Sequence, residues 1–199
     1  MTRKEQKENR QKQILFKALE LFVIKGYMET KITDIASSLN ISVGLLFHYY
    51  ESKEQLYLEL VKIGLDGMKA PQKIKYKEPI EYFEQFLENL FETIDKEPWI
   101  CQIFLLMAQA QKQGIPENIR KLALSVHQIE LSSKVIEEGQ KNGTIKKGNA
   151  FALSNAFWCS VQGIMERKVN FPEIPSPEVS WILDILREVS RNSDDEAYV

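Results

Sequence analysis

Apolar residues recur every three or four positions along almost the whole chain, and the polar residues between them fall on the opposite side of a helix. The alternation of β-branched residues that would indicate strands is absent. Glycine and proline occur between the periodic segments, where helices begin and end. The pattern therefore predicts an all-α protein with about nine helices. These helices are expected over residues 4–25, 31–39, 43–49, 53–68, 79–95, 98–113, 117–142, 149–170 and 177–192.

Two of the predicted helices, 31–39 and 43–49, are shorter than three turns and are joined by a turn of three residues. Helices this short are not stable alone, so their apolar positions must pack on the first helix. In the turn, Asn40 can adopt the left-handed conformation, Ile41 fills the angle between the two helices, and Ser42 is a good N-cap. The segment predicts a helix-turn-helix.

The second short helix carries many apolar and aromatic residues. Leu46 is expected to point inward with Ile41, which leaves the others outward. A plain helical hairpin in a larger bundle has little reason to expose them, whereas the major groove of DNA accepts an α-helix and offers thymine methyl groups. Gly44 would let the backbone approach a phosphate, and Lys53 would neutralise one. The outward residues are Val43, Leu45, Phe47, His48 and Tyr49.

The stretch from Ile14 to Leu56 resembles the DNA-binding region of the tetracycline-repressor (TetR) family, with no gap in its spacing. The body shows only weaker echoes of the family, such as Glu138-Gly139-Gln140. The matching residues are Leu21-Phe22 at the end of the first helix, Gly26-Tyr27, Thr30, Ile32, Asp34-Ile35-Ala36, Ile41-Ser42, Gly44, Phe47 to Tyr50, Ser52-Lys53-Glu54 and Leu56.

The resemblance implies two parts. Residues 1–52 would form a helix-turn-helix DNA-binding domain of three helices, and residues 53–199 a helical ligand-binding and dimerisation domain that begins with a connecting helix. Most members of the family are repressors that a small molecule releases from double-stranded DNA. The residues then expected at the DNA are Lys31, Thr33, Ser42, Val43, Gly44, Leu45, Phe47, His48, Tyr49 and Lys53.

Several positions depart from the family pattern. Phe47 stands where tyrosine is usual, and Tyr49 occupies a common histidine position from which it can supply the missing hydroxyl. Lys31 exchanges a capping hydroxyl for a charge near phosphate. Val43 and Leu45 replace residues that are often polar. Sequence preference is therefore expected to depend on thymine methyl groups and DNA shape.

The distribution of charge supports this division of the chain. The net charge is −2, which gives the whole chain no strongly basic character. Residues 1–17, however, hold six lysines and arginines against two glutamates, a net charge of +4, and the C-terminal tail is acidic. A basic arm thus precedes an acidic body, as expected when one end of a protein approaches DNA.

The body after Pro79 is rich in large apolar side chains, most of which are expected to form a core. Polar residues on apolar faces indicate where a pocket lies. His127 also fits a structural role, because it stands among Leu124, Val126 and Ile129. We expect a hydrophobic or weakly polar effector. Its expected contacts are Phe86, Met107, His127, Trp158 and Gln162.

The last two predicted helices have apolar stripes that can close into a four-helix interface with two-fold symmetry. This arrangement predicts a homodimer, which would read a palindromic operator. The residues expected at the interface are Phe151 and Phe157 on the first of these helices and Val179, Ile182, Leu186 and Val189 on the second.

Catalysis, a cofactor and a metal site are not expected. His127 has no serine, cysteine or aspartate partner at catalytic spacing, and no HExxH, GxSxG, P-loop or GxGxxG motif occurs. Cys101 and Cys159 stand far apart without a CxxC pattern, which predicts reduced core thiols. A ligand-binding or scaffold protein of the same fold that does not bind DNA is the alternative function.

The first residues of the chain are charged where a signal peptide is apolar, and no run of about 18 apolar residues occurs. The sequence therefore predicts a cytoplasmic protein without a membrane partner.

Overall fold

The computed structural model describes residues 2–188, and within them every regular element is a helix. The prediction of an all-α fold is confirmed. The elements are α1 (Arg3–Lys25), α2 (Ile32–Ser38), α3 (Val43–Tyr49), α4 (Lys53–Lys69), the 3-10 helix η1 (Ala70–Lys73), α5 (Pro79–Lys96), α6 (Trp99–Ala110), α7 (Glu117–Ala123), α8 (Gln128–Asn142), α9 (Ala150–Asn170) and α10 (Val179–Leu183).

Two of the predicted ranges were wrong. The segment 117–142 is two helices, because the chain leaves α7 after Ala123 and starts α8 only after His127. In this break the Ser125 hydroxyl donates to the carbonyl oxygen of Leu122 at 2.7 Å, a local bond that competes with the helical pattern. The last helix is also shorter than predicted: α10 is followed by turns over 184–186, and residues 189–192 lie outside the described part.

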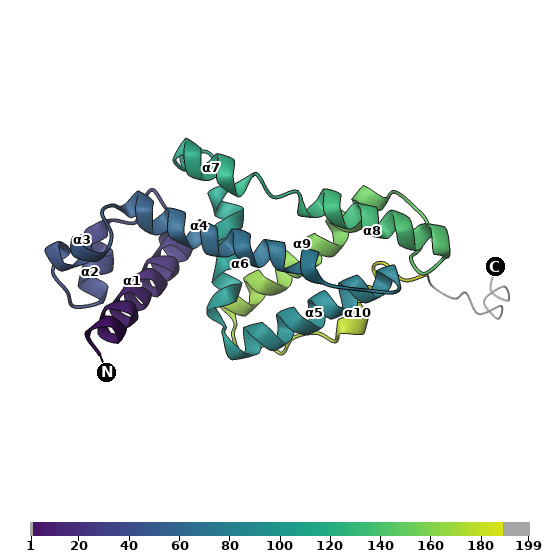
Figure 1. Cartoon of the computed structure of the whole chain (residues 1–199), viewed down its shortest axis with the longest axis horizontal. Helices are drawn as coiled ribbons and strands as arrows, with labels where there is room; N and C mark the ends of the chain where they lie inside the picture. Colours follow the sequence, from purple (N-terminus) through teal and green to yellow (C-terminus); the bar gives the residue numbers. More distant parts are fainter. Residues whose placement is uncertain (1, 189–199) are drawn as a thin grey trace.

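The molecule is elongated, with α1, α2 and α3 at one end and α5, α8, α9 and α10 at the other (Figure 1). Helix α4 runs from the first end toward the second, and α6 crosses it near the middle of the molecule. Helices α4 and α6 therefore connect the two ends of the molecule.

Two hydrophobic cores hold the chain together. The first is built around Ile14 and Phe22 of α1 and Tyr57 of α4, all fully buried, and it also includes residues of α2, α3, α6 and α7. The second is built around Phe83 and Phe157, and it joins α5, α8, α9 and the segment that follows α10. The first core includes residues on both sides of Ser52. The predicted domain boundary between residues 52 and 53 therefore does not coincide with a boundary between the two cores.

Helix α6 contributes to both cores. Ile103 and Met107 point into the first core, whereas Cys101 lies in the second. Helices α4 and α6 pack closely at Gly64, where a β-carbon would stand 2.5 Å from Cγ and Sδ of Met107. A larger residue at this position would require the Met107 side chain or the helix to move.

Candidate functional site

The turn between α2 and α3 has the geometry that the sequence predicts. Asn40 is in the left-handed region with φ of 52°, and the Ser42 side chain accepts a hydrogen bond from the backbone N–H of Leu45 at 3.1 Å. Leu46 is fully buried against the first core, as predicted. These features fix the direction of α3, so that one side of the helix packs inward and the other faces outward.

The outward side of α3 exposes apolar surface. Leu45 is 40% exposed and Phe47 is 45% exposed, and His48 is exposed beside them. Val43 and Tyr49 are half-buried. Gly44 is helical, and a β-carbon there would meet only Oγ of Ser42 at 4.0 Å. The fold itself thus does not require a glycine at this position.

The start of α2 is held by an acidic side chain. Asp34 accepts hydrogen bonds from Nζ of Lys25 at 3.1 Å and from the backbone N–H of Lys31 at 3.3 Å. These donors hold the pKa of Asp34 below its usual value. The Lys31 side chain makes no capping bond, and it is exposed together with Thr33. Both side chains are therefore free to contact a partner.

Lys53 makes contacts that the sequence did not predict. Its ammonium group donates to the carbonyl oxygen of Tyr27 at 2.8 Å, reaches that of Met28 at 3.5 Å, and lies 4.3 Å from the centre of the Tyr27 ring. Burial lowers the pKa of Lys53. The side chain thus fastens the start of α4 to the loop after α1.

The hydroxyl groups of two buried residues, Thr30 and Tyr50, connect α1 to the segments that follow it. The Thr30 hydroxyl donates to the carbonyl oxygens of Leu21 at 3.2 Å and Gly26 at 2.7 Å. The Tyr50 hydroxyl donates to the carbonyl oxygen of Gln11 at 3.3 Å, and burial raises its pKa to about 12. Both residues were noticed in the sequence only as part of the family pattern, because their partners lie on another element.

The structure brings together some of the predicted ligand residues and separates others. The rings of Phe86 and Trp158 lie 4.9 Å apart between α5 and α9, and Gln162 is half-buried one turn further along α9. Met107 instead packs against α4 in the first core. The His127 side chain is 67% exposed and does not belong to either core.

Beside this ring pair lies a buried polar group that the sequence analysis missed. Gln128, at the start of α8, donates from Nε2 to the Tyr82 hydroxyl at 3.2 Å, and its Oε1 is buried without a hydrogen-bond partner among the described residues. Nε1 of Trp158 donates to Oγ of Ser132 at 2.9 Å. This buried acceptor could receive a hydrogen bond from a ligand.

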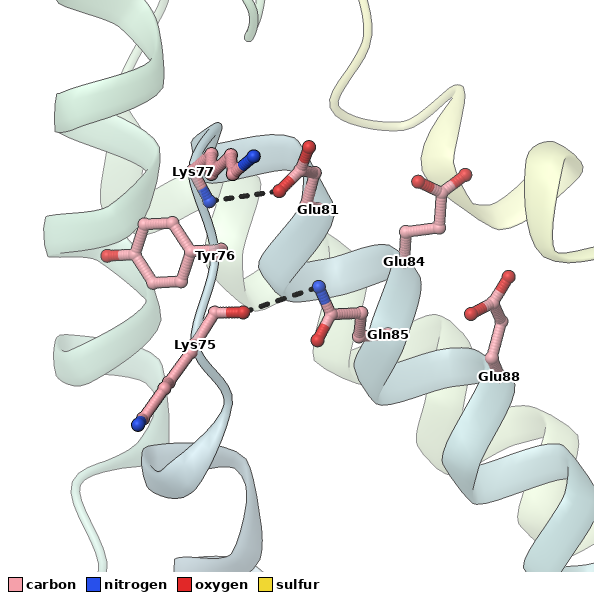
Figure 2. Close-up of a pocket in the computed structure, with 7 residues that line it drawn as sticks. All are labelled: Lys75, Tyr76, Lys77, Glu81, Glu84, Gln85 and Glu88. Atoms are coloured by element: carbon pink, nitrogen blue, oxygen red, sulfur yellow. Dashed lines mark hydrogen bonds between the residues drawn. The ribbon is translucent and has the colours of Figure 1, made fainter.

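An open hollow of about 510 Å³ lies between the segment 75–77 and the N-terminal half of α5 (Figure 2). In it Glu81 accepts from the backbone N–H of Lys77 at 2.9 Å, and Gln85 donates to the carbonyl oxygen of Lys75 at 3.4 Å. None of the predicted ligand residues lines it, and three glutamates and two lysines do. Its charged lining is unlike an apolar effector pocket.

The predicted dimer residues have very different exposures. Phe157 and Leu186 are fully buried in the second core and offer no surface to a second copy, because each is needed to fill its own chain. Phe151 is 52% exposed, Val179 and Ile182 are half-buried, and Val189 lies outside the described residues.

The face of α9 that points away from the second core has mostly small side chains. Ala152, Ala156, Cys159 and Gly163 are all exposed on it. The expectation of a core thiol is confirmed for Cys101, which is 3% exposed and has its pKa raised by burial. It was wrong for Cys159, because that position faces outward from α9.

Among residues 2–188, no helix combines the length and the apolar character that crossing a membrane demands. The same residues contain no cluster of three or more histidine, cysteine, aspartate or glutamate side chains that could hold a metal ion.

Comparison with known proteins adds to this geometry. Residues 14–60 match the family model for bacterial regulatory proteins of the tetR family. The chain is 39% identical over 81 residues to IcaR of Staphylococcus aureus, the negative transcriptional regulator of the biofilm operon icaADBC. This match covers 41% of the present chain and 44% of IcaR. It is 23% identical over 177 residues, 85% of each chain, to the HTH-type transcriptional regulator YfiR of Bacillus subtilis. These relatives are transcriptional regulators and not enzymes.

Solved structures resemble most of the chain. A TetR-family regulator from Bordetella parapertussis has a TM-score of 0.72 at 20% identity, covering 89% of this chain and 94% of that one. A transcriptional regulator from Saccharomonospora viridis, solved in complex with choline, has a TM-score of 0.58 at 22% identity, covering 89% of this chain and 93% of that one. The likeness in fold therefore includes the body as well as α1 to α3.

Proposed function

The chain belongs to the TetR family of bacterial regulatory proteins, and from this we propose that it is a repressor that binds a palindromic operator as a homodimer and is released by a small hydrophobic molecule. As a TetR-family regulator it acts on transcription by binding DNA. The palindromic operator, the homodimer and the release by an effector are the proposed parts of this function, and each is supported by a separate feature.

The observation that carries the proposal is the outward side of α3. Leu45 and Phe47 expose apolar surface at a place where the fold has no use for it, and thymine methyl groups in the major groove would cover that surface. Gly44 supports the same reading, because a β-carbon there would contact nothing closer than 4.0 Å within the chain. The space left by the missing side chain is then available to the DNA backbone.

Residues around α3 would contact the DNA backbone. Lys31 and Thr33 are exposed at the start of α2, where a charge and a hydroxyl can bind phosphate. Ser42, His48 and Tyr49 belong to the same proposed interface. Lys53 would have two roles, because its ammonium group holds the loop after α1 and lies at the edge of this surface.

We place the effector beside the rings of Phe86 and Trp158, with Gln162 at its edge. The buried and unpaired Oε1 of Gln128 supports a ligand that combines an apolar body with one hydrogen-bond donor. The structural relative solved with choline supports a small-molecule site in this fold.

The effector's signal would pass through α6. Helix α6 packs against α9 on one side and against α4 and α1 on the other. A shift of α9 would reach α4 through the contact of Met107 with Gly64. Two recognition helices must lie about 34 Å apart to occupy successive turns of DNA, so a tilt of α4 that changes this separation would release the operator.

A mobility-shift assay with the DNA that flanks the protein's own gene tests DNA binding. We expect binding that an unrelated duplex of equal length does not compete away, and Leu45→Ala should change which bases are preferred. Equal competition by the unrelated duplex would favour the alternative of a ligand-binding or scaffold protein that does not read DNA.

Calorimetry tests the switch. A compound that releases the DNA should bind the free protein more tightly than the protein–DNA complex, by the same factor by which it weakens DNA binding. Equal affinities in the two titrations would mean that the body is not an induction switch.

A further inference from the structure

A second open hollow lies where α1 meets the body, and the proposed function makes no use of it. Its volume is about 610 Å³, within the usual range for small-molecule sites. Its walls come from one side of α1, from the segment 38–40 that leads into α3, and from the start of α6. We call it the α1–α6 hollow. A molecule bound in it would contact both ends of the protein.

Two aromatic side chains in the α1–α6 hollow keep exposed ring surface. The rings of Phe16 and Trp99 lie 5.1 Å apart at an angle of 39°, so each covers only part of the other. Phe16 remains 39% exposed and belongs to neither core, and Trp99 is half-buried. A third aromatic ring placed against this pair would bury further apolar area in the tilted or offset contacts that aromatic rings prefer.

The charged residues of the α1–α6 hollow leave one cation without an acidic partner. Lys17 forms an ion pair with Glu20. Arg10 is half-buried, and among residues 2–188 no acidic side chain lies within 4.0 Å of it. Two cations against one carboxylate give the lining a net charge of +1. The lining therefore favours an anion, to which the amide of Gln102 can add a hydrogen bond.

We propose that the α1–α6 hollow binds a small aromatic anion, with its ring system against Phe16 and Trp99 and its acidic group at Arg10. Arg10 precedes Phe16 by six residues, which is about 9 Å along a helix. The ligand is therefore elongated, with the acidic group at one end of its rings. An aromatic carboxylate meets both requirements, because a guanidinium group binds a carboxylate through two parallel hydrogen bonds.

Other occupants match only part of this lining. A phosphate, free or in DNA, would pair with Arg10 and leave the two rings uncovered. A neutral apolar molecule would cover the rings but would remove water from Arg10 without replacing its interactions. An aromatic cation would be repelled by the net charge of the lining. The aromatic anion is the one class that uses both the rings and the unpaired cation.

The α1–α6 hollow is separate from the effector position proposed above. Trp99 packs against the first core, whereas Phe86 and Trp158 pack against the second. A molecule in the hollow would connect α6 with the segment that leads into α3. The proposal thus adds a second ligand site, and it holds whether or not the body binds an effector.

The three tryptophans of the chain, Trp99, Trp158 and Trp181, allow a test that locates the ligand. In full-length protein labelled with ¹⁵N-tryptophan, each indole N–H gives one NMR signal, and single substitutions by phenylalanine assign the three. The protein is titrated with 2-naphthoate, with its neutral analogue 2-naphthamide and with inorganic phosphate. The Trp99 signal should move with 2-naphthoate, with a dissociation constant below about 1 mM. The amide should bind at least about 5-fold more weakly, and phosphate should not move the signal.

Two variants test the contacts of the α1–α6 hollow. Phe16→Ala removes the exposed ring and Arg10→Gln removes the unpaired cation, and each should weaken the binding of 2-naphthoate by about 5- to 10-fold. Phe151→Ala removes an exposed ring from α9, and Lys134→Gln removes an exposed cation from α8. These two matched controls should bind 2-naphthoate as the wild type does.

Three results would overturn the proposal. One is a Trp99 signal that stays in place up to about 5 mM 2-naphthoate, or that moves equally in Phe16→Ala and Arg10→Gln. Another is movement of the Trp158 signal alone, which would place the anion at the effector position. The third is equal binding of 2-naphthamide, which would exclude recognition of the charge. DNA binding enters none of these measurements, so failure of the hollow leaves the proposed function standing.

Discussion

Helices α3 and α9 each leave a face uncovered, and the two faces differ in chemistry. Helix α3 exposes large apolar side chains, Leu45 and Phe47, next to a glycine and exposed polar residues. Helix α9 exposes a row of small residues, among them Ala156 and Gly163, with Phe151 at one end. Neither face is needed by the core beneath it, so each is expected to have a partner.

The difference indicates which partner covers which face. Protruding side chains on a short helix can enter a groove, and the polar groups around α3 suit the phosphates on both sides of that groove. Small side chains let two helices approach closely over a long contact, which suits a second copy related by a two-fold axis. We therefore propose that DNA covers the face of α3 and that a second copy covers the face of α9.

The largest effect is expected at the α9 face. Ala156→Arg would place a charge in the middle of the small-residue row and should give monomers at micromolar concentration by sedimentation. DNA affinity should fall by about 10²- to 10⁴-fold, because the second half-site is no longer bound by a linked subunit.

Ala108→Arg is the matched control for this change, since Ala108 is an exposed alanine on a different helix, α6. It should remain dimeric. Dimers of Ala156→Arg at the wild-type affinity would show that a different surface joins the two copies.

The next largest effect is expected where α4 packs against α6. Gly64→Ala places a methyl group against Met107 and should cost about 1–3 kcal/mol of the free energy of unfolding. Gly67→Ala, three residues later on α4, meets nothing within 4 Å and should stabilise the protein by up to about 1 kcal/mol. Urea denaturation measures both, and equal effects would contradict the close contact of α4 with α6.

A smaller effect is expected at the α3 face. Leu45→Ala should lower the preference for the operator over a mismatched duplex by about 1 kcal/mol. Its stability should stay within about 0.5 kcal/mol of the wild type, because Leu45 is already exposed. Leu124→Ala removes an equally exposed leucine from the body and should leave the preference unchanged. A loss of about 2–5 kcal/mol in Leu45→Ala, as for a buried leucine, would mean that α3 does not expose Leu45 as described.

The smallest effect is a dependence on pH. Hydrogen bonds from Lys25 and from the backbone of Lys31 lower the pKa of Asp34, so its contribution to stability is present above the usual aspartate pKa of about 3.9 and is lost as pH falls through the lower folded value. Asp34→Asn should be less stable than the wild type at pH 7, and the difference in urea midpoint should shrink at pH 3. A constant difference would exclude this ionisation as its cause.

The sequence was sufficient where the determining residues are neighbours in the chain. The turn before α3 could be predicted from Asn40 and Ser42 because both act on backbone within three residues. The same local reasoning correctly directed Leu46 into the core.

Prediction was weaker where partners are distant in sequence. Lys53 contacts a loop 26 residues earlier, which no local pattern records. In the body, Phe157 and Leu186 follow an apolar stripe, but a stripe does not distinguish a core inside one chain from a surface between two chains. The unpaired oxygen of Gln128 was likewise visible only once α5, α8 and α9 were packed together.

One measurement tests the assignment of both faces at once. Sedimentation of the protein with the duplex upstream of its gene, and with a scrambled duplex of equal length and composition, gives the number of bound chains and the preference between the two DNAs. We predict chains bound in pairs and a preference of about 10³-fold or more for the upstream duplex. Single chains that bind both duplexes equally well would contradict the account.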